Sequence, residues 1–134
     1  MPRNVTDRIL LKAIHDTYYK KYCAIDDIEN PDACTVYLPI DCQAVADKLK
    51  IDVNIVFGRL YYHLDKKYGY KRDNGALVPL FSLVAGHQRH VIHFPLLSAV
   101  VAELEQSYYR FTLPLFLSCF ALMISVVGFI GVNT

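Results

Sequence analysis

The apolar positions between residues 40 and 68 predict two helices joined by a tight turn. The first helix, residues 42–50, has three apolar side chains on one face: Val45, Ala46 and Leu49. The second, residues 53–68, has four at helical spacing: Val56, Phe57, Leu60 and Leu64. Each follows the same start signal, because Asp41 and Asp52 can accept hydrogen bonds from the free N–H groups of a first helical turn. Two capped helices and a tight turn indicate a helix-turn-helix.

One helix before this motif and several strands around it follow from the same kind of pattern. Residues 5–25 repeat apolar side chains at spacings of four and three: Leu10, Ile14, Tyr18, Tyr22 and Ile25. Residues 34–38, CTVYL, are rich in β-forming side chains and predict a short strand. Residues 77–84 and 90–94 predict two more strands, joined by the polar tip 85–89. Two strands joined by a polar tip form a β-hairpin.

The C-terminal part of the chain has no charged side chain over residues 111–132. A helix of that length spans about 33 Å, and the hydrocarbon core of a bilayer is about 30 Å thick. We therefore expect one transmembrane helix there. All 14 Lys and Arg precede it, so the positive-inside rule places the N-terminal domain in the cytoplasm of a single-pass membrane protein. The expected divisions are a domain (1–95), a connecting helix (96–110), the span and a short tail (133–134).

The connecting helix has an apolar stripe at spacings of four, three and four. Its members are Leu97, Val101, Leu104 and Tyr108. Such a stripe can pair with a second copy of the chain and form a homodimer. It can equally pack on its own domain, because two heptads are too short to predict a coiled coil.

The order of the predicted elements resembles the winged helix-turn-helix superfamily over about residues 5–110. The most specific part is residues 40–64, IDCQAVADKLKIDVNIVFGRLYYHL. The resemblance implies an α+β fold, a winged helix-turn-helix domain with the order helix-strand-helix-helix-β-hairpin-helix, followed here by one C-terminal transmembrane helix. It also implies that helix 53–67 enters the major groove of DNA and that the wing tip 86–90 touches the duplex beside it.

The charge distribution decides how far this expectation of DNA binding extends. The net charge of the whole chain is only +1, which argues against a strong DNA binder. Residues 54–93, however, have six basic side chains against two acidic ones and four of the five histidines. The expected DNA-binding residues are Asn54, Arg59, Tyr62, His63, Lys66, Lys67, Lys71, Arg72, His87, Gln88 and Arg89. Alternatively, the basic residues form a solvated helix end, which the helix dipole favours without any ligand.

Two functions fit these patterns, and catalysis fits poorly. The first is a membrane-tethered, regulatory protein that binds duplex DNA. The second is a membrane-anchored adaptor, or the small subunit of a larger membrane-associated system such as a defence system, in which the winged helix docks a partner protein. The sequence has no Gly-rich phosphate loop, no H-E-x-x-H and no G-x-S-x-G, so we expect no enzyme activity and no cofactor. The four cysteines have no C-x-x-C spacing, so we expect no metal site.

Overall fold

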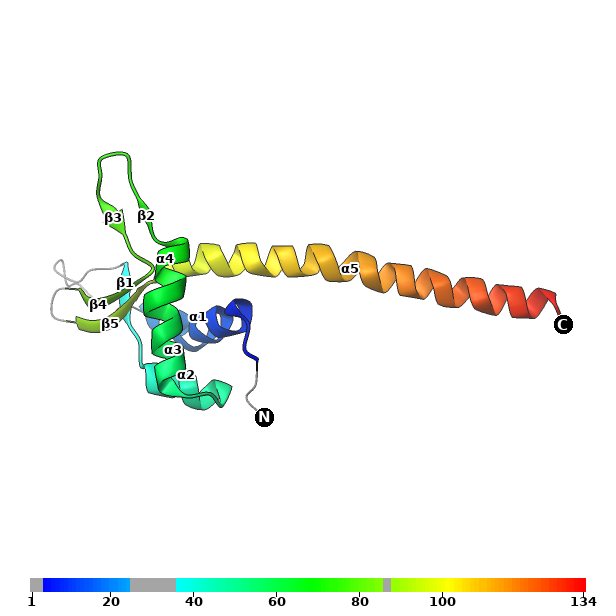
Figure 1. Cartoon of the computed structure of the whole chain (residues 1–134), viewed down its shortest axis with the longest axis horizontal. Helices are drawn as coiled ribbons and strands as arrows, with labels where there is room; N and C mark the ends of the chain where they lie inside the picture. The colour runs from blue at the N-terminus through cyan, green and yellow to red at the C-terminus, as the bar shows by residue number, and fades with distance from the viewer. Residues whose placement is uncertain (1–3, 25–35, 86–87) are drawn as a thin grey trace. The chain divides into compact units, whose positions relative to one another are not determined.

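The computed structural model describes residues 4–24, 36–85 and 88–134 and has an α+β fold (Figure 1). The chain divides into two compact units, Met1–Val101 and Ala102–Thr134. The elements are, in order, α1 (Asp7–Cys23), β1 (Tyr37–Pro39), α2 (Cys42–Leu49), α3 (Val53–Gly58), a π-helical segment (Arg59–Leu64), α4 (Asp65–Tyr68), β2 (Tyr70–Lys71), β3 (Leu77–Val78), β4 (Phe81–Ala85), β5 (Gln88–His93) and α5 (Phe94–Val132).

The helix starts are confirmed at the capping side chains. Asp41 accepts a hydrogen bond from the Gln43 N–H at 2.9 Å, and Asp52 accepts one from the Asn54 N–H at 2.8 Å. Each cap satisfies a backbone donor that the helix itself leaves free. Lys50 then ends α2 with a left-handed backbone (φ 57°), so the chain turns sharply into α3. The two predicted helices and the tight turn between them are therefore present.

The segment Val53–Tyr68, called the third helix below, is continuous helical backbone from α3 through the π-helical segment to α4. The π-helical pattern is visible at its end, where the Asp65 N–H bonds to the carbonyl of Leu60, five residues earlier. The predicted apolar stripe is fully buried at Val56, Leu60 and Leu64, whereas Phe57 is half-buried. Burial of this stripe positions the third helix against the rest of the first unit.

Two small antiparallel sheets follow from the remaining strands. The three-stranded sheet has the order β1-β5-β4, and Ile92 at its centre pairs with Leu38 on one side and Phe81 on the other. The predicted strand 77–84 is wrong as one element, because its first part pairs with β2 in a separate two-stranded sheet. The break falls at Pro79, which has no N–H to donate to a continuous ladder.

The C-terminal helix α5 runs without interruption through the predicted connecting helix and span, and Pro114 lies inside it. His93 caps its first turn, since its Nδ1 accepts from the Leu96 N–H at 3.1 Å. Two members of the predicted dimer stripe, Leu97 and Val101, are buried in the first unit. These two residues therefore pack on the chain's own domain.

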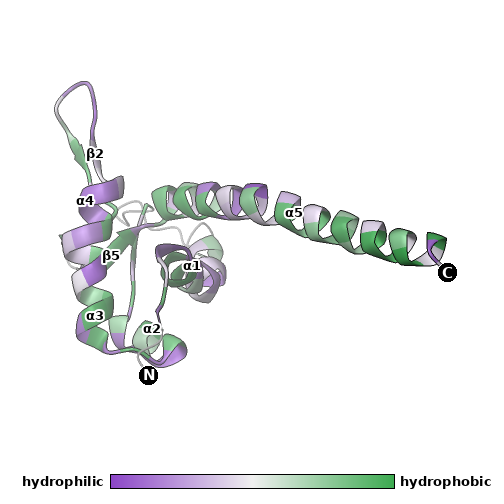
Figure 2. Cartoon of the chain, turned by 45° about the vertical axis from the view of Figure 1, so that its right-hand side comes forward, coloured by the Kyte–Doolittle hydropathy of each residue, from purple (hydrophilic) through white to green (hydrophobic). Residues whose placement is uncertain are grey.

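Among the described residues, α5 is the helix that is long and apolar enough to cross a membrane. Its apolar window has no buried residue, and Figure 2 shows that its C-terminal part is mostly hydrophobic. The hydroxyls of Thr112 and Ser118 donate to the carbonyls of Tyr108 and Pro114 at 2.7 and 2.8 Å. These bonds satisfy polar side chains within the helix, as a hydrocarbon environment requires.

Candidate nucleic-acid interface

The outward side of the third helix consists of three predicted site residues: Asn54, Tyr62 and Lys66. Each is two positions away in sequence from a residue of the buried stripe, so it points away from the core. All three are exposed, and Tyr62 has 73% of its surface free. The hydroxyphenyl, amide and ammonium groups on this side can reach an approaching macromolecule without any rearrangement of the fold.

Three other predicted site residues lie along one edge of the third helix and contact a single carboxylate. The guanidinium of Arg59 donates to Asp7 Oδ1 and also to the carbonyl of Val5. Asp7 Oδ2 lies 3.5 Å from His63 Nε2 and 3.7 Å from Lys67 Nζ. We call Asp7, Arg59, His63 and Lys67 the Asp7 cluster. Its three basic residues are four positions apart, which places them on the same side of a helix.

The basic side chains of the Asp7 cluster lower the pKa of the Asp7 carboxyl. Partial burial of Asp7 raises its pKa, but the hydrogen bond from Arg59 and the positive charges of Arg59, His63 and Lys67 outweigh burial, so that the pKa lies below its ordinary value of 3.8. The side chains of Asp7 and Arg59 are only 22% and 24% exposed. Arg59, one of the residues predicted to contact DNA, therefore pairs with Asp7 in this structure.

The basic residues Lys71 and Arg72 stand apart from the third helix. They belong to the β2–β3 hairpin, which projects past the end of α4 (Figure 1). The Arg72 N–H bonds to the Ala76 carbonyl at 2.8 Å, and Gly75 has the positive φ of 85° that this turn needs. Both cations are exposed, and within the described ranges no ion pair involves them.

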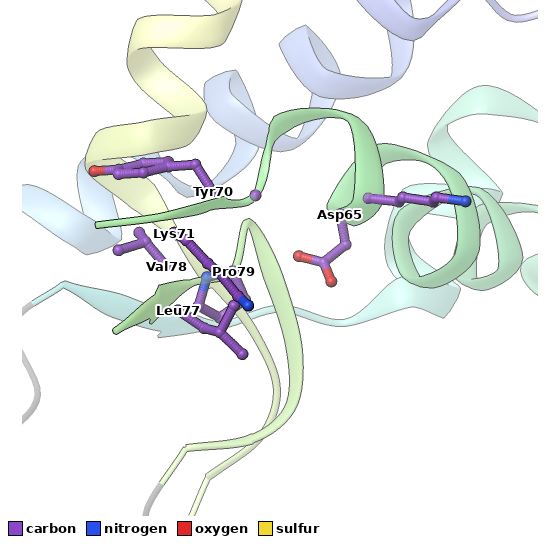
Figure 3. Close-up of a pocket in the computed structure, with 8 residues that line it drawn as sticks. Asp65, Tyr70, Lys71, Leu77, Val78 and Pro79 are labelled. Carbon is purple, nitrogen blue, oxygen red and sulfur yellow. The ribbon is translucent and has the colours of Figure 1, made fainter. Parts of the chain in front are cut away.

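A hollow of about 260 Å³ lies at the base of this hairpin (Figure 3). Its lining includes Leu77, Val78 and Pro79 on one side and Asp65 on the other. The Asp65 carboxylate already accepts the N–H groups of Leu80 and Phe81 at 2.8 and 3.2 Å. We therefore assign Asp65 a structural role, which is to fix the point where the chain enters β4.

The hairpin β4–β5 contributes one described site side chain, the exposed Arg89. His87 lies outside the described residues, and Gln88 is described only as the first residue of β5. His90 has a left-handed backbone (φ 52°), and its ring lies 5.5 Å from that of Phe57. This contact connects the hairpin to the third helix.

Within residues 4–24, 36–85 and 88–134, no three His, Cys, Asp or Glu side chains gather closely enough to hold a metal ion. The carboxylates that gather polar groups are Asp7 and Asp65, and protein donors already engage both.

Neither Asp7 nor Asp65 stands out in the sequence. Asp7 occupies the first turn of a helix, where a carboxylate is common because of the helix dipole. Its partner Arg59 is 52 residues away, and the donors to Asp65 are 15 and 16 residues away. No local pattern signals contacts at such separations.

Comparisons of the chain with protein-family models, with curated proteins and with solved structures give no match. The function is therefore inferred from three features of the geometry. These are the outward side of the third helix, the Asp7 cluster and the long apolar helix α5.

Proposed function

We propose that the first unit is a winged-helix domain that binds duplex DNA, and that α5 holds it at a membrane. The topology supports the fold. A short strand, β1, precedes the helix-turn-helix and pairs with β5, the returning strand of the hairpin that follows it. The hairpin β4–β5 is then the wing, and the third helix is the recognition helix.

The observation that carries the DNA proposal is the outward side of the third helix. Its buried stripe leaves Asn54, Tyr62 and Lys66 facing solvent. An Asn amide can pair with adenine, and a Lys ammonium can contact guanine or a phosphate. Exposed Arg89 on the wing and Lys71 and Arg72 on the neighbouring hairpin supply further contacts to phosphates.

Helix α5 supports the membrane part of the proposal. The charge-free stretch 111–132 lies within it, and all 14 Lys and Arg precede that stretch. The positive-inside rule then places the DNA-binding unit in the cytoplasm, where DNA is accessible. Tethering confines the domain to DNA near the membrane.

Duplex binding by the full chain in nanodiscs of zwitterionic lipid tests this proposal. Fluorescence anisotropy with a labelled duplex should show binding that weakens steeply as salt rises. The double substitution Tyr62→Ala with Lys66→Ala should weaken binding at least about tenfold, given the usual size of base and phosphate contacts. Tyr19→Ala with Lys20→Ala is the matched control, because it removes the same two side-chain types from exposed positions of α1. No binding at low salt would contradict the proposal.

A second candidate function, protein docking, is favoured by one observation. Ile55 is 54% exposed at the start of the third helix and lines a hollow of about 450 Å³ together with Val5 and Ile51. An exposed aliphatic at an apolar hollow suits the apolar core of a protein interface better than it suits DNA. A partner bound here should be released by Ile55→Ser, whereas DNA binding should change little.

A further inference from the structure

We propose that Arg59, His63 and Lys67 form a binding site for one phosphate group of a nucleic-acid backbone, and that the Asp7 carboxylate occupies this site when DNA is absent. This inference rests on the proposed DNA binding and deepens it. It assigns Asp7 the role of an internal competitor for the phosphate.

The geometry of the Asp7 cluster resembles that of a bound anion. Arg59 donates to one carboxylate oxygen, while His63 and Lys67 approach the other. Arg and Lys on a helix edge contact the oxygens of a phosphate in the same manner. The second donation of Arg59, to the Val5 carbonyl, keeps the guanidinium in place when the carboxylate leaves.

The contacts of His63 and Lys67 with Asp7 are weaker than that of Arg59, so a phosphate can replace the carboxylate step by step. His63 and Lys67 lie 3.5 and 3.7 Å from Asp7, and their side chains are 58% and 50% exposed. Ion pairs with that much solvent exposure are weak, and salt screens them. An incoming phosphate can therefore bind these two side chains first and then compete with the carboxylate for Arg59.

The competition has a consequence for the net charge of the interface. With Asp7 in place, the carboxylate cancels one of the positive charges that the third helix presents. Removal of that negative charge should let the protein neutralise one more phosphate, and each neutralised phosphate adds about 0.9 to the slope of log affinity against log salt. The low net charge of the chain would then understate its affinity for DNA once Asp7 is displaced.

The test compares Asp7→Asn with Asp47→Asn in the full chain in zwitterionic nanodiscs. Both substitutions remove one negative charge from the first unit, but Asp47 is exposed on α2 and contacts Gln43 rather than the cluster. Asp7→Asn should bind a labelled duplex at least about tenfold more tightly than wild type, and its salt slope should be steeper by about one. Asp47→Asn should change affinity less than threefold.

A matched pair of lysines keeps the test valid if Asp7→Asn folds poorly. Lys67→Ala removes one contact to the phosphate and should weaken binding about threefold or more. Lys20→Ala, at an exposed position of α1, should change affinity less than threefold. Circular dichroism shows whether each variant is folded.

Three results separate this inference from the proposed function. A gain confined to Asp7→Asn supports the inference. Equal gains from Asp7→Asn and Asp47→Asn, or equal affinities of the Lys67→Ala and Lys20→Ala variants, overturn it and leave DNA binding intact. No binding by the wild type or by any variant overturns both.

Discussion

Asp7 and Asp65 each connect the third helix to a neighbouring element, but the groups that donate to them differ. Asp65 accepts hydrogen bonds from two backbone N–H groups at the entry to β4, whereas Asp7 forms ion pairs with the basic side chains of the third helix. A partly buried backbone N–H has few alternative partners, whereas an exposed cation can turn to another anion. The two identical side chains therefore hold different groups: Asp65 holds backbone N–H groups at the entry to β4, and Asp7 holds basic side chains of the third helix.

The largest expected effect is that of Asp65→Ala. It leaves the N–H groups of Leu80 and Phe81 without their acceptor, so we expect a loss of about 2–4 kcal/mol in the free energy of unfolding of the first unit. Urea denaturation followed by circular dichroism measures this. Asp73→Ala, at an exposed turn position, should stay within about 0.5 kcal/mol of wild type. Similar losses of unfolding free energy in the two variants would contradict the structural role assigned to Asp65.

Gly69→Ala tests the same junction through the backbone. A Cβ at Gly69 would lie 2.5 Å from the Asp65 carbonyl oxygen, so the helix end must shift, at a cost of about 1–3 kcal/mol. Gly58→Ala is the control inside the same helix, because a Cβ there meets only the Tyr62 ring at 4.0 Å. It should be neutral or stabilise by up to about 1 kcal/mol. The same denaturation experiment gives both values, and a tolerated Gly69→Ala would contradict the close approach.

Arg59→Ala should have a smaller effect than either change at the Asp65 junction. It leaves the partly buried Asp7 carboxylate without its main donor, so we expect a loss of about 1 kcal/mol. Lys66→Ala should lie within about 0.5 kcal/mol of wild type, since Lys66 is exposed and has no ion pair among the described residues. Equal losses of unfolding free energy in Arg59→Ala and Lys66→Ala would mean that the contact between Arg59 and Asp7 contributes no stability.

The smallest expected effect is the pH dependence of the Asp7 contribution. The pKa of Asp7 is lowered in the folded state, so the unfolded state binds more protons in the window between the two pKa values. The stability from Asp7 is therefore present above its ordinary pKa of 3.8 and is lost as pH falls through the lowered pKa. The difference in Tm between wild type and Asp7→Asn should be constant from pH 7 to about 4 and shrink below. A difference that stays constant well below pH 4 would contradict this contribution of Asp7.

The parts of the structure that depend on local chemistry could be predicted from the sequence. The caps at Asp41 and Asp52 and the buried stripe of the third helix depend on residues within one or two turns of each other. The division of strand 77–84 could not be predicted, because it depends on Asp65 as well as on Pro79. The continuity of α5 was missed for a different reason, since a change from polar to apolar side chains is no signal for a helix end.

For the candidate site, composition identified the charged residues but not which of them are available. The basic residues of 54–93 appear equivalent in the sequence, yet Arg59, His63 and Lys67 contact Asp7 and Lys66 does not. That difference comes from the packing of α1, whose first residue is 52 positions before Arg59. The net charge of residues 54–93, counted without Asp7, therefore overestimates the positive charge that the third helix presents to a ligand.

Photocrosslinking tests contact between DNA and the outward side of the third helix most directly. p-Benzoylphenylalanine in place of Tyr62 keeps an aromatic side chain at a position that is 73% exposed, and the same replacement of Tyr19, on α1 and 51% exposed, is the control. After illumination of membranes with bound DNA, the chain labelled at position 62 should be crosslinked to DNA and the chain labelled at position 19 should not. A crosslink from position 62 to a protein, or DNA crosslinks of equal yield from both positions, would contradict the proposed DNA interface.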